Sequence, residues 1–219
     1  MKHIVAINAS PRTVWNTAQL VREAARGAES EGAEVEVIDL YRLEKFTGCI
    51  SCFGCKRDPN KGKCICRDGL YPVLEAIRNV HGLIIGTPNY LGDVSAGFRA
   101  LYERLIFESL TYKNSPRSYN EHLIPVLFIM TSNAPKEYYT PFGYGGMVKN
   151  YEDTLGAFVG KTKTLIAGNT QQVKDYSAYD WTMFDGEAKI RRREEVFPKE
   201  KEKAYSLGAE MVKSPWQRA

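Results

Sequence analysis

Residues 3–20 read HIVAINASPRTVWNTAQL, and this stretch decides the fold. Its opening HIVAIN is apolar and partly β-branched, as in a strand that is buried on both faces. The polar loop ASPRTVWNT follows, and Asn16 and Thr17 are the expected N-caps of a helix that runs to about Ser30. The stretch therefore predicts the strand–loop–helix unit from which α/β proteins are built.

The loop of this unit places hydroxyls, amides and one arginine at the start of a helix, on Ser10, Arg12, Asn16 and Thr17. Unpaired N–H groups and the helix dipole at such a point favour a phosphate. The loop lacks the pattern G-x-G-x-x-G, which disfavours a dinucleotide pyrophosphate relative to a single terminal phosphate. An ordinary capped loop is the alternative, because every α/β protein has one.

The rest of the chain repeats this alternation. Further strands are expected at 34–40, 82–88, 123–130 and 162–168, and further helices at about 70–79, 95–110, 147–158 and 195–213. Such alternation predicts a parallel sheet with helices on both faces. Five strands admit the doubly wound, flavodoxin-like order 2-1-3-4-5, in which ligands bind at the carboxyl ends of strands 1 and 3.

The composition agrees with one α/β domain. The chain has 219 residues, of which 43% are hydrophobic, and a formal net charge of +4. This mild basic excess does not indicate nucleic-acid binding. The start, MKHIVAIN, is too short an apolar run for a signal peptide, and the run at 123–130 is far below the ~18–20 residues that span a bilayer. We therefore expect a soluble cytoplasmic protein with no membrane or nucleic-acid partner.

Two more strand ends carry loops that suit a ligand. TPNYLGDVSA follows the third strand at 87–96, where an aromatic residue beside proline and glycine can lie flat against a planar ring. Gly92 lets backbone N–H groups approach the heteroatoms of that ring. Ser132 and Asn133 follow the fourth strand, and the aromatic, glycine-rich stretch 138–146 then either covers the ligand or packs on another subunit. A plain turn is the alternative for the loop after the third strand.

All five cysteines lie within eighteen residues, at Cys49, Cys52, Cys55, Cys64 and Cys66. The spacing C-x2-C-x2-C-x8-C-x-C is typical of a single loop that holds a [4Fe–4S] cluster. Zinc usually takes two well-separated cysteine pairs, and free or redox-active thiols suit a reducing compartment, so both stay open. A disulfide framework is disfavoured, because the number is odd and such frameworks belong to small secreted chains.

The three strand-end loops together resemble the NAD(P)H-dependent FMN reductase branch of the flavodoxin-like superfamily. The family pattern G-S-P-R-x-x-x-N-T matches Ser10–Arg12 and Asn16–Thr17, with alanine in place of the glycine. The pattern S-P-V-Y-x-G-N-V-S matches residues 87–95, with Asp93 for the usual asparagine.

The cysteine loop adds a resemblance to the iron–sulfur flavoproteins of that branch. Their cysteine segment ends G-x-C-x-x-x-D, which matches residues 62–68. The match makes Cys64 the family cysteine and Cys66 the extra one. The gap between the third and fourth cysteines is longer here than in the compact motif of the family.

The resemblance implies two cofactors, FMN and a [4Fe–4S] cluster, and names their ligands. The phosphate would lie on Ser10, Arg12, Asn16 and Thr17. The ring would lie against Pro88, Asn89, Tyr90, Leu91, Gly92, Asp93 and Ser95, with Ser132 and Asn133 beside it. The cluster would be bound by Cys49, Cys52, Cys55 and Cys64, with Cys66 dispensable.

The function implied is an FMN-dependent oxidoreductase or electron-transfer flavoprotein that couples one- and two-electron partners. The donor would be NAD(P)H or a ferredoxin-like protein, and the acceptor a small molecule or a protein. A homodimer or homotetramer is also implied. One alternative is a cluster-free NAD(P)H-dependent FMN or quinone reductase with free or zinc-bound cysteines, and another is a non-enzymatic flavin and thiol redox sensor.

We expect one domain over residues 1–219, with the cysteine-rich loop at 47–68 and a C-terminal extension at about 169–219. The loop leaves the carboxyl end of the second strand, so it is expected on the FMN side of the sheet. Arg191–Arg193 is interpreted as a solvated charged run, or else as a grip for the 2′-phosphate of NADPH. The aromatic segment 175–184 is interpreted as an oligomer arm or as a loop packed on its own domain. Three histidines at the starts of strands are predicted to be structural: His3, His81 and His122.

Overall fold

The computed structural model describes residues 1–213. Five parallel strands form one sheet in the order β2-β1-β3-β4-β5. The strands are β1 (His3–Asn8), β2 (Glu34–Asp39), β3 (Gly82–Pro88), β4 (Val126–Thr131) and β5 (Thr162–Ala167). The predicted flavodoxin-like order is therefore confirmed.

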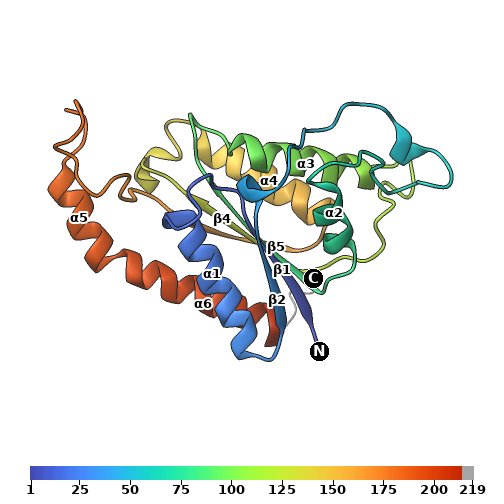
Figure 1. Cartoon of the computed structure of the whole chain (residues 1–219), viewed down its shortest axis with the longest axis horizontal. Helices are drawn as coiled ribbons and strands as arrows, with labels where there is room; N and C mark the ends of the chain where they lie inside the picture. The colour runs from blue at the N-terminus through green and yellow to red at the C-terminus, as the bar shows by residue number, and fades with distance from the viewer. Residues whose placement is uncertain (214–219) are drawn as a thin grey trace.

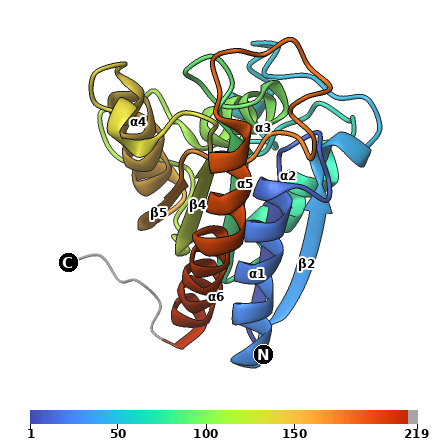
Figure 2. The same ribbon diagram turned by 90° about the vertical axis from the view of Figure 1, so that its left-hand side faces the viewer.

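Helices cover both faces of this sheet (Figures 1 and 2). One face carries α1 (Asn16–Ser30) and α6 (Phe197–Lys213), and the other carries α2 (Tyr71–Arg78), α3 (Ala96–Ser109) and α4 (Tyr144–Phe158). The helix α5 (Gly186–Glu195) precedes α6. Three short 3-10 turns complete the described elements, at Leu40–Arg42, Gly54–Lys56 and Lys136–Tyr138.

The core consists of two apolar layers, one on each side of the sheet. Every residue of β3 is buried, as expected for a central strand covered on both faces. Helices α1 and α6 approach so closely that a Cβ on Gly27 would lie 1.9 Å from the carbonyl oxygen of Tyr205, and one on Gly208 would lie 1.9 Å from that of Ala24. The two glycines thus permit this backbone contact, which fixes α6 of the C-terminal extension onto the domain.

The structure differs from the predicted elements at several boundaries. Strand β4 begins at Val126 rather than at residue 123, since Pro125 has no N–H group for a strand ladder. Helix α4 begins at Tyr144, three residues earlier than expected. Helix α5 was not predicted at all. The last six residues of the predicted C-terminal extension, 214–219, lie outside the described residues.

None of the helices in residues 1–213 has the length and apolar character that a membrane span requires. The three histidines lie at the amino ends of the strands. His3 forms a 3.1 Å contact with Glu34, its backbone N–H donates to Nδ1 of His81, and Nε2 of His122 lies 3.0 Å from the carbonyl of Val80. These contacts agree with the structural role predicted for them.

Candidate functional site

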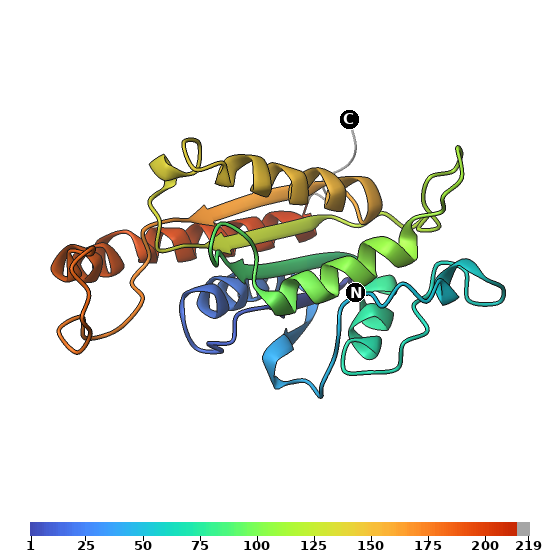
Figure 3. The same ribbon diagram turned by 90° about the horizontal axis from the view of Figure 1, so that it is seen from above.

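A cleft of about 130 Å³ lies at the carboxyl ends of the strands. The strands are parallel, and the strand arrows visible in Figure 3 point toward the end of the molecule where α5 lies. Four chain segments line the cleft: Ser10, Arg12, Trp15, Asn16 and Thr17; Pro88, Asn89 and Tyr90; Thr131, Ser132 and Asn133; and Thr170, Gln171 and Gln172. The structure thus brings together nine of the thirteen residues that the sequence predicts for the FMN site.

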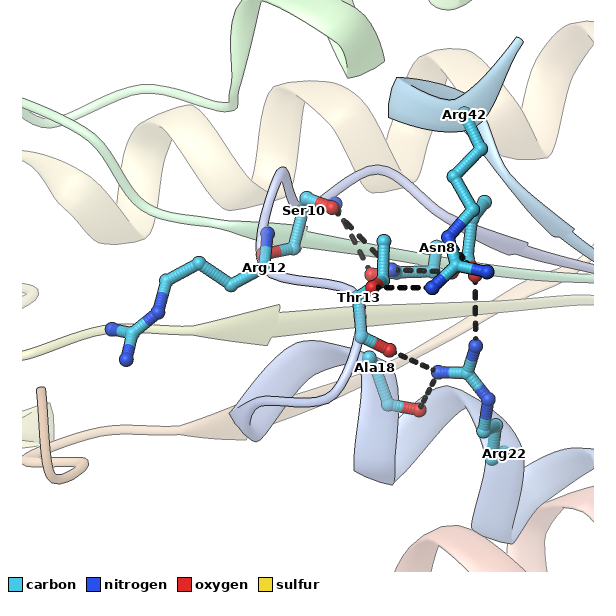
Figure 4. Close-up of polar contacts among 8 residues, drawn as sticks. Asn8, Ser10, Arg12, Thr13, Ala18, Arg22 and Arg42 are labelled. Carbon is cyan, nitrogen blue, oxygen red and sulfur yellow. Dashed lines mark hydrogen bonds and ion pairs between the residues drawn. The ribbon is translucent and has the colours of Figure 1, made fainter. Parts of the chain in front are cut away.

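The loop between β1 and α1 is held by a network of polar contacts (Figure 4). Asp39, at the end of β2, accepts hydrogen bonds from Asn8 Nδ2 at 2.7 Å and from Arg22 at 2.9 Å. Arg22 also donates to the carbonyl of Thr13, and Arg42 donates to its hydroxyl. The side chain of Arg12 points away from this network (Figure 4) and donates to the carbonyl of Gln172. The network therefore fixes the loop while Arg12 stays at the cleft.

The start of α1 has no side-chain cap, and Trp15 rather than Asn16 or Thr17 is the N-cap residue. The predicted caps are wrong, because both side chains have other partners. Asn16 donates to the carbonyl of Gln171 at 2.7 Å and accepts from Arg193, while Thr17 and Thr131 share a 2.7 Å hydrogen bond between hydroxyls. The first-turn amides of α1 are thus left for an anion, and Asn16 can offer a phosphate its backbone N–H more readily than its side chain.

The turn after β3 places only its first residues in the cleft. Tyr90 and Asp93 pair as an isolated antiparallel bridge, and the two residues between them have positive φ angles, 55° at Leu91 and 87° at Gly92. A Cβ on Gly92 would lie 2.9 Å from the ring of Tyr144, so glycine is needed there for space as well as for conformation.

Four predicted ring contacts fall outside the lining of the cleft: Leu91, Gly92, Asp93 and Ser95. The side chain of Leu91 projects into solvent. That of Asp93 accepts from the hydroxyl of Tyr151 at 2.8 Å. Ser95 is fully buried, caps α3 by accepting from Phe98 N–H and donates to the carbonyl of Ala9. Ser95 therefore joins two strand-end loops, and its side chain has no free donor for a ligand.

Helix α5 reaches this edge of the sheet and contacts two of the loops. Arg193 donates to the side chains of Asn16 and Gln19, and its guanidinium carbon lies 5.1 Å from the centre of the Trp15 ring. Lys189 donates to the backbone carbonyl of Asn133 at 2.9 Å and to its side-chain oxygen at 2.6 Å. Sequence reasoning missed Lys189 and named Arg193 only within the run Arg191–Arg193, because α5 is highly charged and lacks an apolar stripe.

These contacts correct the interpretation of Arg191–Arg193 as one solvated run. Arg191 is exposed and lies 3.5 Å from Glu187, whereas Arg192 is mostly buried and pairs with Glu200 at 2.6 Å. Arg193 is half-buried at the loop of the cleft, and burial together with the nearby Arg12 lowers its pKa. The three arginines thus have three different surroundings.

The five cysteines line a second, smaller pocket. Cys49, Cys52, Cys55, Cys64 and Cys66 face it together with Arg104, Phe107 and Glu108 of α3. Cys55 is buried, and burial raises the pKa of its thiol. Within residues 1–213, no three acidic, histidine or cysteine side chains are close enough together to hold a metal ion. The thiols therefore share a pocket without forming a closed metal site.

Charged side chains of α3 hold the cysteine loop in place. Glu108, only 2% exposed, accepts from the backbone N–H of Cys64 at 2.8 Å and from Arg78 at 2.7 Å. Arg104, 1% exposed, pairs with Asp68 at 2.5 Å and donates to the carbonyl of Cys66 at 2.8 Å. Although burial opposes it, the hydrogen bond from Arg104 holds the pKa of Asp68 below its usual value.

The cysteine pocket does not lie on the FMN side of the sheet, so that prediction is wrong. Arg104 and Phe107 lie eight and eleven residues beyond the first residue of α3, roughly 12–17 Å along the helix. The loop around Gly54–Lys56 reaches the end of the molecule opposite α5 (Figures 1 and 3). Lys56 holds it there by donating to the carbonyls of Phe107 and Leu110. The chain turns back along α3 after β2, which a strand-by-strand reading does not reveal.

The model of one protein family matches residues 2–137, and its description is NADPH-dependent FMN reductase. The chain belongs to this family. An iron-sulfur flavoprotein of Methanocaldococcus jannaschii is 39% identical to the chain over 101 residues. The match covers 46% of the chain and 50% of the relative. An iron-sulfur flavoprotein of Archaeoglobus fulgidus is 31% identical over 137 residues, 62% of the chain and 63% of that relative. The chain thus spans about half to two thirds of the length of these curated relatives.

Solved structures agree with the fold of the FMN reductase family. The NAD(P)H:quinone oxidoreductase from Methanothermobacter marburgensis superposes with a TM-score of 0.69 at 14% identity, over 96% of each chain. The azoreductase from Bacillus anthracis str. Sterne has the same TM-score at 12% identity, over 96% of this chain and all of the other. At such low identity these likenesses concern the fold alone.

The cleft offers hydrogen-bonding groups that suit the cofactor of the FMN reductase family. Nδ2 of Asn89 and Oε1 of Gln172 are buried at the cleft without a hydrogen bond of normal geometry among residues 1–213, although the hydroxyl of Tyr139 lies near enough to Asn89 to interact with it. The side-chain oxygen of Asn89, Oδ1, accepts a hydrogen bond from Gly92 N–H, which fixes the orientation of this side chain. A buried donor and a buried acceptor without partners are costly unless a ligand supplies them. The cleft therefore fits a molecule that has both polar ring atoms and a phosphate.

Proposed function

We propose that the chain binds FMN in the cleft at the carboxyl ends of the strands and acts as an FMN-dependent oxidoreductase. The observation that carries the proposal is the pairing of an uncapped α1 with two unpartnered amide groups in one cleft of an FMN reductase family member. Arg12 and the first amides of α1 would hold the phosphate. Asn89 and Gln172 would meet polar atoms of the ring or its side chain.

The family description supports NAD(P)H as the electron donor. FMN would supply exchange of either one or two electrons, and a [4Fe–4S] cluster would supply one-electron transfer. The protein's own part is to bind and orient these groups. Asp39, Arg22 and Arg42 fix the phosphate loop, while Ser132 is held by its 2.7 Å bond to the carbonyl of Ala134 and by Tyr139 at 3.0 Å.

We propose Cys49, Cys52, Cys55 and Cys64 as the cluster ligands. Two observations support this set: all four line one pocket, and the relatives are named iron-sulfur flavoproteins. All five thiols line the pocket, and the match of residues 62–68 to the family pattern G-x-C-x-x-x-D is what favours Cys64 over Cys66, whose thiol donates to Asp68 at 3.8 Å. The buried guanidinium of Arg104 lies beside the thiols and interacts with Cys64, while its Nε has no hydrogen bond of normal geometry among the described residues. The donor set therefore fits an anionic cluster, provided that the loop contracts on binding.

The alternative is a cluster-free reductase of the same family with free or zinc-bound cysteines. The separation of the thiols within the described chain favours the form of this alternative in which the cysteines are free. Anaerobic purification distinguishes the two. Acid-labile sulfide, with broad absorbance at about 400 nm in addition to the flavin bands, is expected for the cluster protein. Stoichiometric zinc without sulfide, or a flavin spectrum alone, would leave the cluster-free reductase.

We further propose that the protein works as a homodimer or homotetramer. Within one chain the cysteine pocket and the cleft lie at different ends of α3. A neighbouring subunit can place its cysteine pocket nearer to the cleft than the same chain does. Sedimentation of the reconstituted protein tests the assembly, and mixed oligomers of cysteine-free and cleft-deficient subunits test the transfer between subunits. Recovery of electron transfer in such mixtures is the expected result.

A further inference from the structure

A second pocket, of about 450 Å³, adjoins the cleft. Asn133 lines both. The pocket is bounded on one side by the segment after β4 and on the other by the segment that leads into α5. Its lining includes Asn133, Tyr138, Phe142, Tyr144, Asp185 and Lys189. The C-terminal extension thus adds a wall that the five strand–helix units alone do not provide.

The pocket presents flat aromatic surface. Tyr138 and Phe142 are in contact, with ring centres 5.5 Å apart, and Phe142 and Tyr144 follow at 6.0 Å. Tyr138 is half-exposed and Phe142 is mostly exposed. Since exposed aromatic rings that face a cavity bind other planar rings by stacking and by apolar contact, the pocket suits a planar aromatic molecule.

A buried cation lies in the same lining. Lys189 is only 7% exposed, and the two oxygens that accept from it, both on Asn133, are uncharged. No carboxylate within residues 1–213 forms an ion pair with it. Burial, with a further contribution from Arg192, lowers its pKa to about 8. A buried ammonium group without a counter-ion is costly, and an anionic ligand in the pocket would offset that cost.

We propose that this pocket binds a small planar aromatic anion, a carboxylate or phenolate whose charged oxygen meets Lys189 and whose ring stacks on the aromatic side chains. The other titratable or charged groups around Lys189 are Asp185 and the tyrosines of the pocket lining, together with Arg192 on α5. Asp185 is engaged as the N-cap of α5, where it accepts from Ala188 N–H at 2.9 Å. The carboxylate of Asp185 therefore leaves the ammonium group to the ligand.

The position beside the cleft makes such a molecule the second substrate of the oxidoreductase, a role that rests on the proposed function. Binding itself does not rest on it. Equilibrium titration therefore separates the two questions, because it needs no electron transfer. Failure of FMN reduction with intact binding would refute the proposed function and leave this site standing.

The test uses two probes of the same shape, 2-naphthoate and the neutral 2-naphthamide, titrated into the protein with and without added FMN. We expect 2-naphthoate to bind at least tenfold more tightly than the amide. Lys189→Met should abolish that preference, Lys189→Arg should retain it, and Lys199→Met on the exposed surface of α6 should leave it unchanged. FMN affinity is measured in each variant, because Lys189 also holds Asn133.

Several outcomes would overturn the proposal. These are equal affinity of the wild-type protein for the two probes, no binding of 2-naphthoate up to millimolar concentration, or a preference that survives in Lys189→Met. Displacement of 2-naphthoate by FMN would place the probe in the cleft instead, which also overturns it. Should Lys189→Met fail to fold, the wild-type preference and its retention in Lys189→Arg still decide the matter.

Discussion

The cleft and the cysteine pocket are built in opposite ways. In the cleft the protein fixes its loops by hydrogen bonds, such as those among Asn8, Asp39 and Arg22, and leaves a few groups unpaired. In the cysteine pocket the backbone is fixed by Arg104 and Glu108, while the thiols stay too far apart to hold an ion. The difference is the one expected if the flavin site is preformed and the proposed cluster site forms only as the metal binds.

The largest expected effect tests the cysteine pocket. Replacing Cys49, Cys52, Cys55 or Cys64 singly by serine should deplete iron and acid-labile sulfide, because each removes one thiolate ligand. Cys66→Ser is the matched control and should retain both. FMN affinity should survive all five substitutions, since the cleft and the pocket share no lining residue. Cluster loss in Cys66→Ser together with retention in Cys64→Ser would reverse the assignment of the fourth ligand.

The next largest expected effect is a loss of stability when the ion pair between Arg104 and Asp68, which holds the cysteine loop, is removed. Arg104→Met removes one partner of a buried pair and leaves Asp68 without its 2.5 Å ion pair. Breaking a buried pair in this way costs about 3–5 kcal/mol of unfolding free energy. Urea unfolding measures it, and iron content should fall with it. Arg26→Met, which loses only an exposed pair with Glu23, should cost under about 1 kcal/mol. Equal losses in the two variants would contradict a special role for Arg104.

The sequence predicts the cleft better than it predicts the cysteine pocket, and the reason is physical. The strands and their order follow from apolar runs and alternation, and the cleft follows from the order, since the ends of parallel strands must meet at one edge. Ser10, Arg12 and Thr17 therefore lie at the cleft, and their contact with the phosphate stays a prediction. The path of residues 47–68 depends on tertiary contacts with α3, such as those of Lys56 and Glu108. No periodicity reports such contacts, and the loop was placed at the wrong end.

The wrong predictions at the cleft, the N-cap at Asn16 and the missed helix α5, have a similar cause. Asn16 looks like an N-cap in sequence, but Gln171 and Arg193, more than 150 residues away, take up its side chain. Lys189 and Arg193 lie on a helix whose sequence is almost entirely charged, GEAKIRRREE. Its contacts with the sheet edge come from the alkyl stems and charges of these long side chains rather than from an apolar face. A hydrophobic pattern cannot reveal a helix of this kind.

A smaller effect tests the preformed character of the cleft. Arg12→Ala combined with Thr17→Ala should weaken FMN binding at least tenfold, or about 1.4 kcal/mol, because charge-assisted contacts to the phosphate are lost. Titration of apoprotein with FMN measures it by the quenching of flavin fluorescence. Val14→Ala, an exposed change in the same loop, is the matched control. Affinity that is unchanged in the double variant would place the phosphate elsewhere.

The smallest expected effect concerns Lys189, a buried charge at the edge of the cleft, and is a change in the pH dependence of stability. Its pKa is lowered to about 8 from an ordinary 10.5, so between these values the unfolded chain binds more protons than the folded one. The free energy of unfolding should therefore rise with pH in this window, by about 1 kcal/mol per pH unit, relative to Lys189→Met. Urea unfolding of both proteins at pH 7, 8, 9 and ~9.5 gives the difference directly. Other groups cancel in it, including Tyr139, whose pKa burial also raises. Lys199→Met should follow the wild-type curve. A difference that stays constant from pH 7 upward would mean that water reaches Nζ of Lys189, and the argument for a counter-ion in the adjoining pocket would lose its basis.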